Sequence, residues 1–214
     1  MSLAAQLDHG LATQLDQGLA ALDLSLAPAQ RDKLIAYLAL LAKWNAVHNL
    51  TAVREESKMV SHHLLDSLAV LPYLDESALL DVGSGGGLPG IPLAIARPGM
   101  PVTLLDSNQK KSAFLQQAAI ELQLPNVSVI NLRVEDYVPP ALFATIISRA
   151  FADLDEFVSA AKHLLAPGGV FAAMKGLQPH EEIAQLSTGF RVKNMHRLTV
   201  PGVSAERHLL LIGA

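Results

Sequence analysis

The sequence of 214 residues contains no cysteine. Disulfide bonds, thiolate nucleophiles and thiolate metal sites are therefore excluded. The chain also lacks an apolar run of the roughly 18 residues that a membrane-spanning helix needs. No lysine or arginine precedes Arg31, whereas a secretory signal begins with basic residues. We therefore expect a cytoplasmic protein that does not associate with a membrane.

Charged residues are scarce, at 17%, whereas hydrophobic residues make up 50% of the chain. This composition predicts a sizeable core rather than disorder. The formal net charge of −4 provides no overall attraction to nucleic acid, so any contact with RNA must come from a local basic surface. The length suits one larger domain, or one domain with a small addition, and we expect a monomer.

Residues 1–75 predict an N-terminal helical extension. The related segments LDHGLA and LDQGLA, within residues 7–20, suggest an interrupted and loosely packed helix. The spacing of apolar residues after Pro28 predicts a second helix, and we expect the ring of Trp44 in this helix to pack against the core. Residues 55–74 predict a third helix, with Ser57 as a possible N-cap.

Residues 76–214 show a different pattern, in which short apolar runs alternate with helical stretches. Strands are predicted at 77–82, 100–106, 127–132, 143–150 and 168–176, and helices at 88–97, 107–123, 154–166 and 180–186. Such alternation is typical of an α/β fold with a parallel sheet. The last two apolar segments, 190–200 and 206–214, are close enough to form an antiparallel hairpin. We expect this core and the helical extension to form one compact unit.

The stretch DVGSGGGLPG, residues 81–90, follows the first predicted strand and contains five glycines. Ligands of open parallel sheets bind beyond the carboxyl ends of the strands, and glycines there permit positive φ and close approach. One alignment, Gly85-x-Gly87-x-x-Gly90, is a dinucleotide fingerprint. The other is Asp81-x-Gly83-x-Gly85-x-Gly87. An acid directly before the loop is unfavourable for a pyrophosphate but suits a cofactor with a positive ammonium group.

Two further acids follow neighbouring predicted strands. Asp106 can accept both hydroxyls of a ribose, a contact that nicotinamide cofactors and S-adenosylmethionine share. Glu135, in the segment RVEDY, can accept a hydrogen bond from an adenine amino group. The alternatives are that Asp106 caps the next helix and that Glu135 is a solvated acid in a turn.

Seven blocks of the chain carry a resemblance to a known family. They are KWNAVHNLTAVRE (43–55), HHLLDSL (62–68), DVGSGGGLPGIPLAI (81–95), LLDSNQKKSAFL (104–115), RVEDY (133–137), ISRAFADL (147–154) and MKG (174–176). Together they resemble the class I S-adenosylmethionine-dependent methyltransferases with a Rossmann-like fold. Within that class they are similar to the bacterial 16S ribosomal RNA guanine-N7 methyltransferases, the RsmG/GidB family.

The resemblance implies transfer of a methyl group from S-adenosylmethionine to N7 of a specific guanosine in 16S ribosomal RNA or the small ribosomal subunit. It implies cofactor contacts at Gly83, Gly85, Leu88, Asp106, Val134, Glu135 and Arg149. The role of Arg149 is open, because a cation beside a sulfonium is unfavourable; it can instead contact the cofactor carboxylate or order the loop. The segment SNQKK departs from the family pattern, where a glycine is expected before the basic residues.

The implied chemistry agrees with what the sequence lacks. N7 of guanine carries a lone pair and no proton, so in-line placement can supply much of the catalysis and we expect no catalytic side chain. Methylation at C5 of a pyrimidine needs a cysteine, which is absent. Methylation of an exocyclic amine usually accompanies an Asn/Asp-Pro-Pro-aromatic motif, and the corresponding segment here, ISRAF, has no proline.

Contacts with RNA phosphates are expected from lysine and arginine. Lys175, Arg197 and Arg207 are our candidates, although each alone can equally be a solvated surface charge. His62 and His63 are adjacent and would not share one face of a helix, so we expect no metal site.

Three other functions remain open at this point. A methyltransferase of small molecules is favoured slightly by the negative net charge. An NAD(P)-dependent oxidoreductase would use the dinucleotide alignment of the glycine loop. A binding protein that has lost activity is disfavoured by the intact loop together with Asp106 and Glu135.

Overall fold

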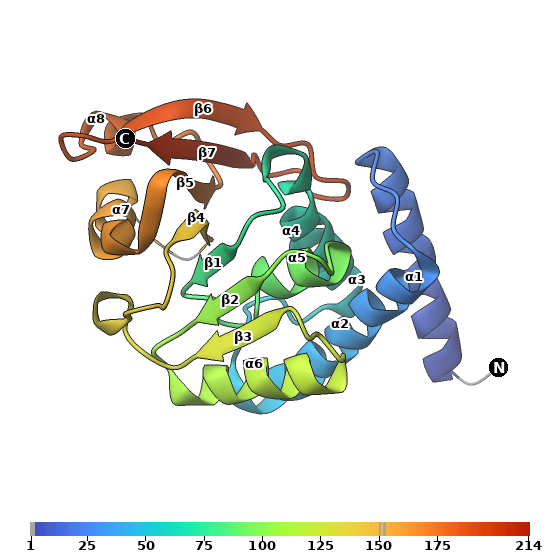
Figure 1. Cartoon of the computed structure of the whole chain (residues 1–214). Coiled ribbons are helices and arrows are strands. Elements are labelled where there is room, and N and C mark those ends of the chain that lie inside the picture. The colour runs from blue at the N-terminus through green and yellow to red at the C-terminus, as the bar shows by residue number, and fades with distance from the viewer. Residues whose placement is uncertain (1–2, 150, 152) are drawn as a thin grey trace.

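The computed structural model describes residues 3–149, 151 and 153–214, and its strands form one sheet (Figure 1). The strands are β1 (Leu79–Val82), β2 (Val102–Leu105), β3 (Val127–Ile130), β4 (Phe143–Ser148), β5 (Leu165–Lys175), β6 (Arg191–Arg197) and β7 (His208–Gly213). Their spatial order is β3-β2-β1-β4-β5-β7-β6. Strands β1 to β5 are parallel, and β7 is antiparallel to both β5 and β6. The predicted α/β fold, a mostly parallel sheet closed by a C-terminal hairpin, is confirmed.

Helices cover both faces of this sheet (Figure 1). Helices α5 (Gly90–Ala96) and α6 (Gln109–Glu121) pack on one face with the N-terminal helices, while α7 (Leu154–Ala161) packs on the other and contacts the short α8 (His180–Ala184). Successive side chains of a strand point to opposite faces. Leu79 accordingly joins the first of two core clusters and Leu80 the second.

The N-terminal extension is helical, with two departures from the prediction. Helix α1 (Leu3–Ala21) is continuous, and Leu15 and Leu19 are buried, so it is neither interrupted nor loosely packed. After α2 (Pro28–His48), the chain forms α3 (Glu56–Met59), a π-helical turn η1 (Val60–Leu65) and α4 (Asp66–Leu68). Ser57 lies inside α3 and is not its N-cap, because the helix begins one residue earlier and Glu55 takes that position.

The extension and the sheet share one hydrophobic core. Trp44 of α2 packs its ring against Phe114 of α6, with 5.6 Å between the ring centroids, as predicted. The first core cluster contains Leu34 and Leu64 from the extension as well as Leu93 from α5. The division at residue 75 remains a prediction, and this continuous core is the physical reason to expect one unit. In the described part of the chain, no helix has both the length and the hydropathy that crossing a membrane requires.

Candidate functional site

The glycine loop connects β1 to α5 at the carboxyl edge of the parallel strands. Gly83, Gly85 and Gly87 have φ values of 71°, 58° and 82°, a region that favours glycine. At Gly87 a Cβ atom would also lie 2.4 Å from Cδ1 of Ile91, so a side chain would meet both strain and a clash. The backbone N–H of Gly83 donates to the carbonyl of Leu105 at 2.8 Å, which anchors the start of the loop on β2.

Asp81 lies beneath this loop rather than in a pocket. Its side chain is fully buried, and Oδ2 accepts a hydrogen bond of 3.0 Å from the N–H of Gly90, where α5 begins. Oδ1 has no hydrogen-bond partner. Burial raises the pKa of Asp81 to about 7. The expectation that Asp81 attracts a cofactor ammonium is not supported, because its carboxylate faces the side of the sheet that α5 covers.

A cavity of about 320 Å³, which we call the acidic pocket, lies at the carboxyl ends of β1, β2 and β3. Its lining consists of Val82, Gly83, Leu105, Asp106, Ser107, Lys111, Leu132, Arg133, Val134, Glu135 and Phe151. The structure therefore brings together four of the predicted cofactor residues, Gly83, Asp106, Val134 and Glu135, from three separate connections. Their contact with a cofactor remains a prediction.

Asp106 is held by the fold in an orientation suited to a ligand. Its carboxylate accepts the N–H of Asn108 at Oδ1 (2.8 Å) and the N–H of Gly85 at Oδ2 (2.9 Å). Each carboxylate oxygen has two lone pairs, so both oxygens retain capacity for ribose hydroxyls. The alternative role as a helix cap belongs instead to Asn108, whose side chain accepts from the N–H groups of Lys110 and Lys111 at the start of α6.

The other predicted cofactor residues occupy different environments. Val134 and Glu135 lie in the 3-10 turn η3 (Val134–Asp136), where Glu135 is exposed. Leu88 is buried in the first core cluster and is not among the residues that line the acidic pocket, and its contact with a cofactor remains a prediction. Gly85 contributes through the N–H that it donates to Asp106.

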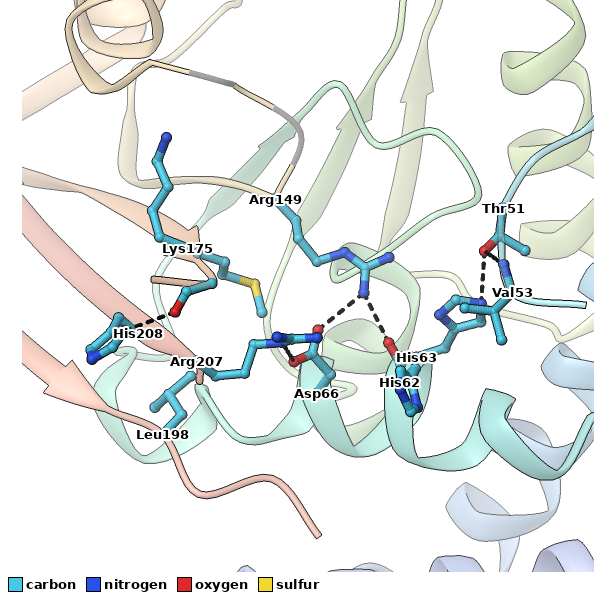
Figure 2. Close-up of a pocket in the computed structure, with 12 residues that line it drawn as sticks. Thr51, Val53, His62, His63, Asp66, Arg149, Lys175, Leu198, Arg207 and His208 are labelled. Atoms are coloured by element: carbon cyan, nitrogen blue, oxygen red, sulfur yellow. Dashed lines mark hydrogen bonds and ion pairs between the residues drawn. The ribbon is translucent and has the colours of Figure 1, made fainter. Parts of the chain in front are cut away.

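A second cavity, of about 340 Å³, lies beside the carboxyl ends of β4 and β5; we call it the arginine pocket (Figure 2). It is lined by Thr51, Val53, His62, His63, Asp66, Arg149, Met174, Lys175, Gly176, Leu198, Arg207 and His208. Its wall thus includes residues of the N-terminal extension. Figure 2 shows Arg149 extending toward Asp66 from above and Arg207 from the left.

Arg149 lies in this pocket and not among the residues of the acidic pocket. Its Nη1 contacts Oδ2 of Asp66 at 3.1 Å and donates to the carbonyl of His62 at 3.2 Å. A third cavity, of about 640 Å³, is lined by both Arg149 and Phe151, and Phe151 also lines the acidic pocket. The prediction that Arg149 contacts the cofactor remains untested, and its partners here are protein groups of the neighbouring helix.

His63 forms the buried wall of the arginine pocket. Its Nε2 lies 3.0 Å from Oγ1 of Thr51, which accepts the N–H of Val53 at 3.1 Å. Burial and the nearby Arg149 lower the pKa of His63 to about 4, so the ring is neutral at pH 7. Sequence reasoning assigned no role to His63 or Asp66; the only signal was their position in the block HHLLDSL.

The three candidate RNA contacts differ in availability. Lys175 is not a free surface cation, because its Nζ pairs with Oε2 of Glu182 at 2.7 Å and its side chain is 11% exposed. Arg197 is 73% exposed and lies 3.6 Å from Glu206. Arg207 lines the arginine pocket, and its Nε lies 2.8 Å from Oδ1 of Asp66.

The strand order, the antiparallel hairpin and a glycine loop facing an acid at the end of β2 define a methyltransferase with a Rossmann-like fold. Residues 30–210 match the family described as GidB, rRNA small subunit methyltransferase G. The chain belongs to this family.

Named relatives agree with this assignment, and a solved structure shares the fold. A protein named ribosomal RNA small subunit methyltransferase G from Aromatoleum aromaticum is 55% identical over 214 residues, covering 98% of each chain. A Burkholderia pseudomallei protein of the same name is 57% identical over 198 residues, covering 89% of this chain and 85% of its own. The crystal structure of TrmN from Thermus thermophilus shares the fold, with a TM-score of 0.55 and 20% sequence identity. The match covers 72% of this chain and 53% of TrmN.

Proposed function

We propose that this protein transfers a methyl group from S-adenosylmethionine to N7 of a specific guanosine in 16S ribosomal RNA. The observation that carries the proposal is a pair of unlike pockets at the carboxyl ends of the parallel strands, connected by a third cavity that Arg149 and Phe151 line. The acidic pocket suits an adenosine, and the arginine pocket suits a polyanion. Family membership supports ribosomal RNA of the small subunit as that polyanion.

The residues of the acidic pocket fit S-adenosylmethionine. Asp106 offers two oriented oxygens to the ribose hydroxyls, and Gly83 allows close approach of a ligand to the backbone. Glu135 is exposed at the rim and can accept from the adenine amino group. When bound, this cofactor supplies the methyl group from its sulfonium, and the neutral thioether is the leaving group.

The reaction requires placement of the base rather than proton transfer. N7 of guanine is unprotonated, so its lone pair can attack the methyl carbon directly once the two are aligned. The chain therefore acts by holding the cofactor and the nucleotide in line.

The arginine pocket supplies donors for RNA phosphates. A guanidinium has five N–H donors, and the contacts with Asp66 use only part of those of Arg149 and Arg207. Arg197 lies at the exposed end of β6 and provides a more distant contact. We expect the protein to act in the cytoplasm, where small subunits assemble, and as a monomer.

The test is to incubate the protein with labelled S-adenosylmethionine and small ribosomal subunits that lack the modification. Label should appear in 16S ribosomal RNA, and chemical cleavage should map it to one 7-methylguanosine. Parallel reactions with naked 16S RNA establish which form is the substrate. Label on small molecules with none in RNA would overturn the proposal in favour of a small-molecule methyltransferase.

A further inference from the structure

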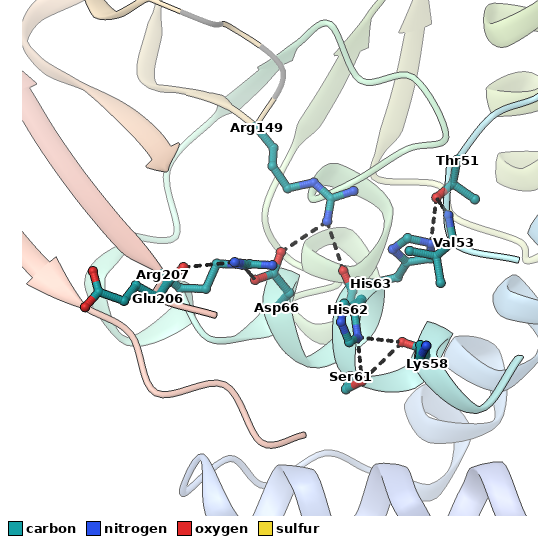
Figure 3. A network of polar contacts seen from close by, with 10 residues as sticks. All are labelled: Thr51, Val53, Lys58, Ser61, His62, His63, Asp66, Arg149, Glu206 and Arg207. Carbon is teal, nitrogen blue, oxygen red and sulfur yellow. Dashed lines mark hydrogen bonds and ion pairs between the residues drawn. The ribbon is translucent and has the colours of Figure 1, made fainter. Parts of the chain in front are cut away.

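The carboxylate of Asp66 joins two arginines that are far apart in the sequence (Figure 3). Oδ2 lies 3.1 Å from Nη1 of Arg149, which follows β4, and Oδ1 lies 2.8 Å from Nε of Arg207, which precedes β7. Asp66 is 2% exposed. Each carboxylate oxygen therefore engages one guanidinium, and the three side chains form a bridge from the N-terminal extension to the end of β4 and the start of β7.

The surroundings keep this bridge in one arrangement. Arg149 also donates to the carbonyl of His62, and Arg207 donates to the carbonyl of Glu206 at 2.9 Å. Asp66 follows directly after the π-helical turn η1, a type of turn that occurs frequently at functional sites. Both guanidiniums are thus fixed by a carboxylate and a carbonyl, which sets the planes of their remaining N–H groups.

The charges of the bridge make its effect testable. Two guanidiniums and one carboxylate give the bridge itself a net charge of +1. Removing the carboxylate charge would raise this to +2, which by simple electrostatics strengthens attraction for RNA phosphates. It would also free two neighbouring cations that repel each other, so that they no longer keep their directions.

We propose that Asp66 is a positioning residue for the RNA substrate, which acts by aiming the guanidiniums of Arg149 and Arg207 into the arginine pocket. The inference rests on the proposed function. It assigns to a carboxylate, which repels RNA, the role of improving RNA recognition. It also explains why the helical extension supplies one wall of the pocket: the extension carries the group that orients the arginines.

The experiment compares Asp66→Asn with the wild-type protein on unmodified small subunits. We expect kcat/KM for subunits to fall about tenfold or more, with most of the loss in KM, while the Kd for S-adenosylmethionine stays unchanged. Asp16→Asn is the matched control, because Asp16 pairs with Arg31 at 2.8 Å outside the pocket. This control should behave as the wild type. Circular dichroism and cofactor binding establish that each variant is folded.

A double-mutant cycle separates positioning from a general structural role. If Asp66 acts through Arg207, the loss caused by Asp66→Asn should be much smaller in the Arg207→Ala background. Tighter or unchanged binding of subunits by a folded Asp66→Asn variant would overturn the inference, as would full additivity of the two changes. An inactive wild-type protein would overturn the proposed function, and this inference with it, whereas an active wild type with an unaffected Asp66→Asn variant overturns only the inference.

Discussion

The backbone N–H of Gly85 donates a hydrogen bond to Oδ2 of Asp106, 2.9 Å away. This bond joins the glycine loop after β1 to the end of β2, and Oδ1 is held in turn by the N–H of Asn108. The orientation of the carboxylate therefore comes from the backbone of two neighbouring connections. A ligand that bonds to Asp106 meets a group whose direction is already set.

Replacing Asp106 with alanine should weaken binding of S-adenosylmethionine by about 1–3 kcal/mol, because the ribose loses its acceptors and the loop loses the bond to Gly85. Isothermal titration calorimetry measures the change. Asp136→Ala is the matched control, since Asp136 is an exposed acid that does not line the acidic pocket. Equal affinity of the Asp106→Ala variant and the wild type would rule out the ribose role.

Tyr37 tests the support that the N-terminal extension gives to the loop. Its buried hydroxyl donates to the carbonyl of Gly86, so Tyr37→Phe leaves that carbonyl without this partner. We expect the free energy of unfolding in urea to fall by about 1–3 kcal/mol and the cofactor to bind more weakly. Tyr73→Phe, which alters a partly exposed ring stacked on His196, should change neither quantity. Cofactor affinity unaffected by Tyr37→Phe would show that the loop keeps its shape without α2.

The raised pKa of the buried Asp81 side chain predicts that the free energy of unfolding depends on pH. Burial raises its pKa to about 7 in the folded protein, compared with about 3.9 in an unfolded chain. A raised pKa favours folding with the proton bound, so this contribution is complete below about pH 4 and is lost as pH rises through about 7. The Asp81→Asn variant has no carboxyl group at this position and therefore lacks this titration.

Relative to Asp81→Asn, the wild type should therefore lose unfolding free energy between about pH 4 and pH 7, by an amount on the order of a few kcal/mol. Urea denaturation of both proteins across this range measures the difference, in which the other titrating groups cancel. A difference that does not vary with pH would contradict the raised pKa of Asp81.

Replacing Arg207 and replacing Arg197 should have unequal effects on RNA binding. Arg207→Ala removes a donor inside the arginine pocket, whereas Arg197→Ala removes a charge that is 73% exposed. We expect Arg207→Ala to weaken binding of unmodified small subunits strongly. The slope of log affinity against log salt concentration should also become shallower, by about the amount that one phosphate contact contributes. Arg197→Ala should have the smaller effect. Filter binding at several salt concentrations tests both variants, and equal losses would contradict a special role of the pocket.

Much of the fold follows from local pattern. The apolar runs that became β1 to β5 are flanked by helical periodicity, and parallel strands are buried on both faces, so each run was recognisable in isolation. The π-helical turn η1 was not predictable in this way. The turn packs against α1, and the sequence of residues 55–74 resembles an ordinary amphipathic helix.

The site was predictable where it depends on chain connections and unpredictable where it depends on long-range contacts. Gly83, Asp106 and Glu135 each follow a strand, and parallel strands end at one edge, so their meeting in the acidic pocket could be anticipated. The inward direction of the Asp81 side chain could not be anticipated, because the alternation of side chains along a strand does not say which face of the sheet lies under the loop.

By itself, the sequence determined the order of strands and helices, the place of the glycine loop and the acids beside it, because these depend on residues adjacent in the chain. Only the tertiary structure decided the partners of the charged groups. Asp66 meets Arg149 and Arg207 across 83 and 141 residues. Ion pairs of this kind form where folding brings distant segments together, and no local periodicity encodes them.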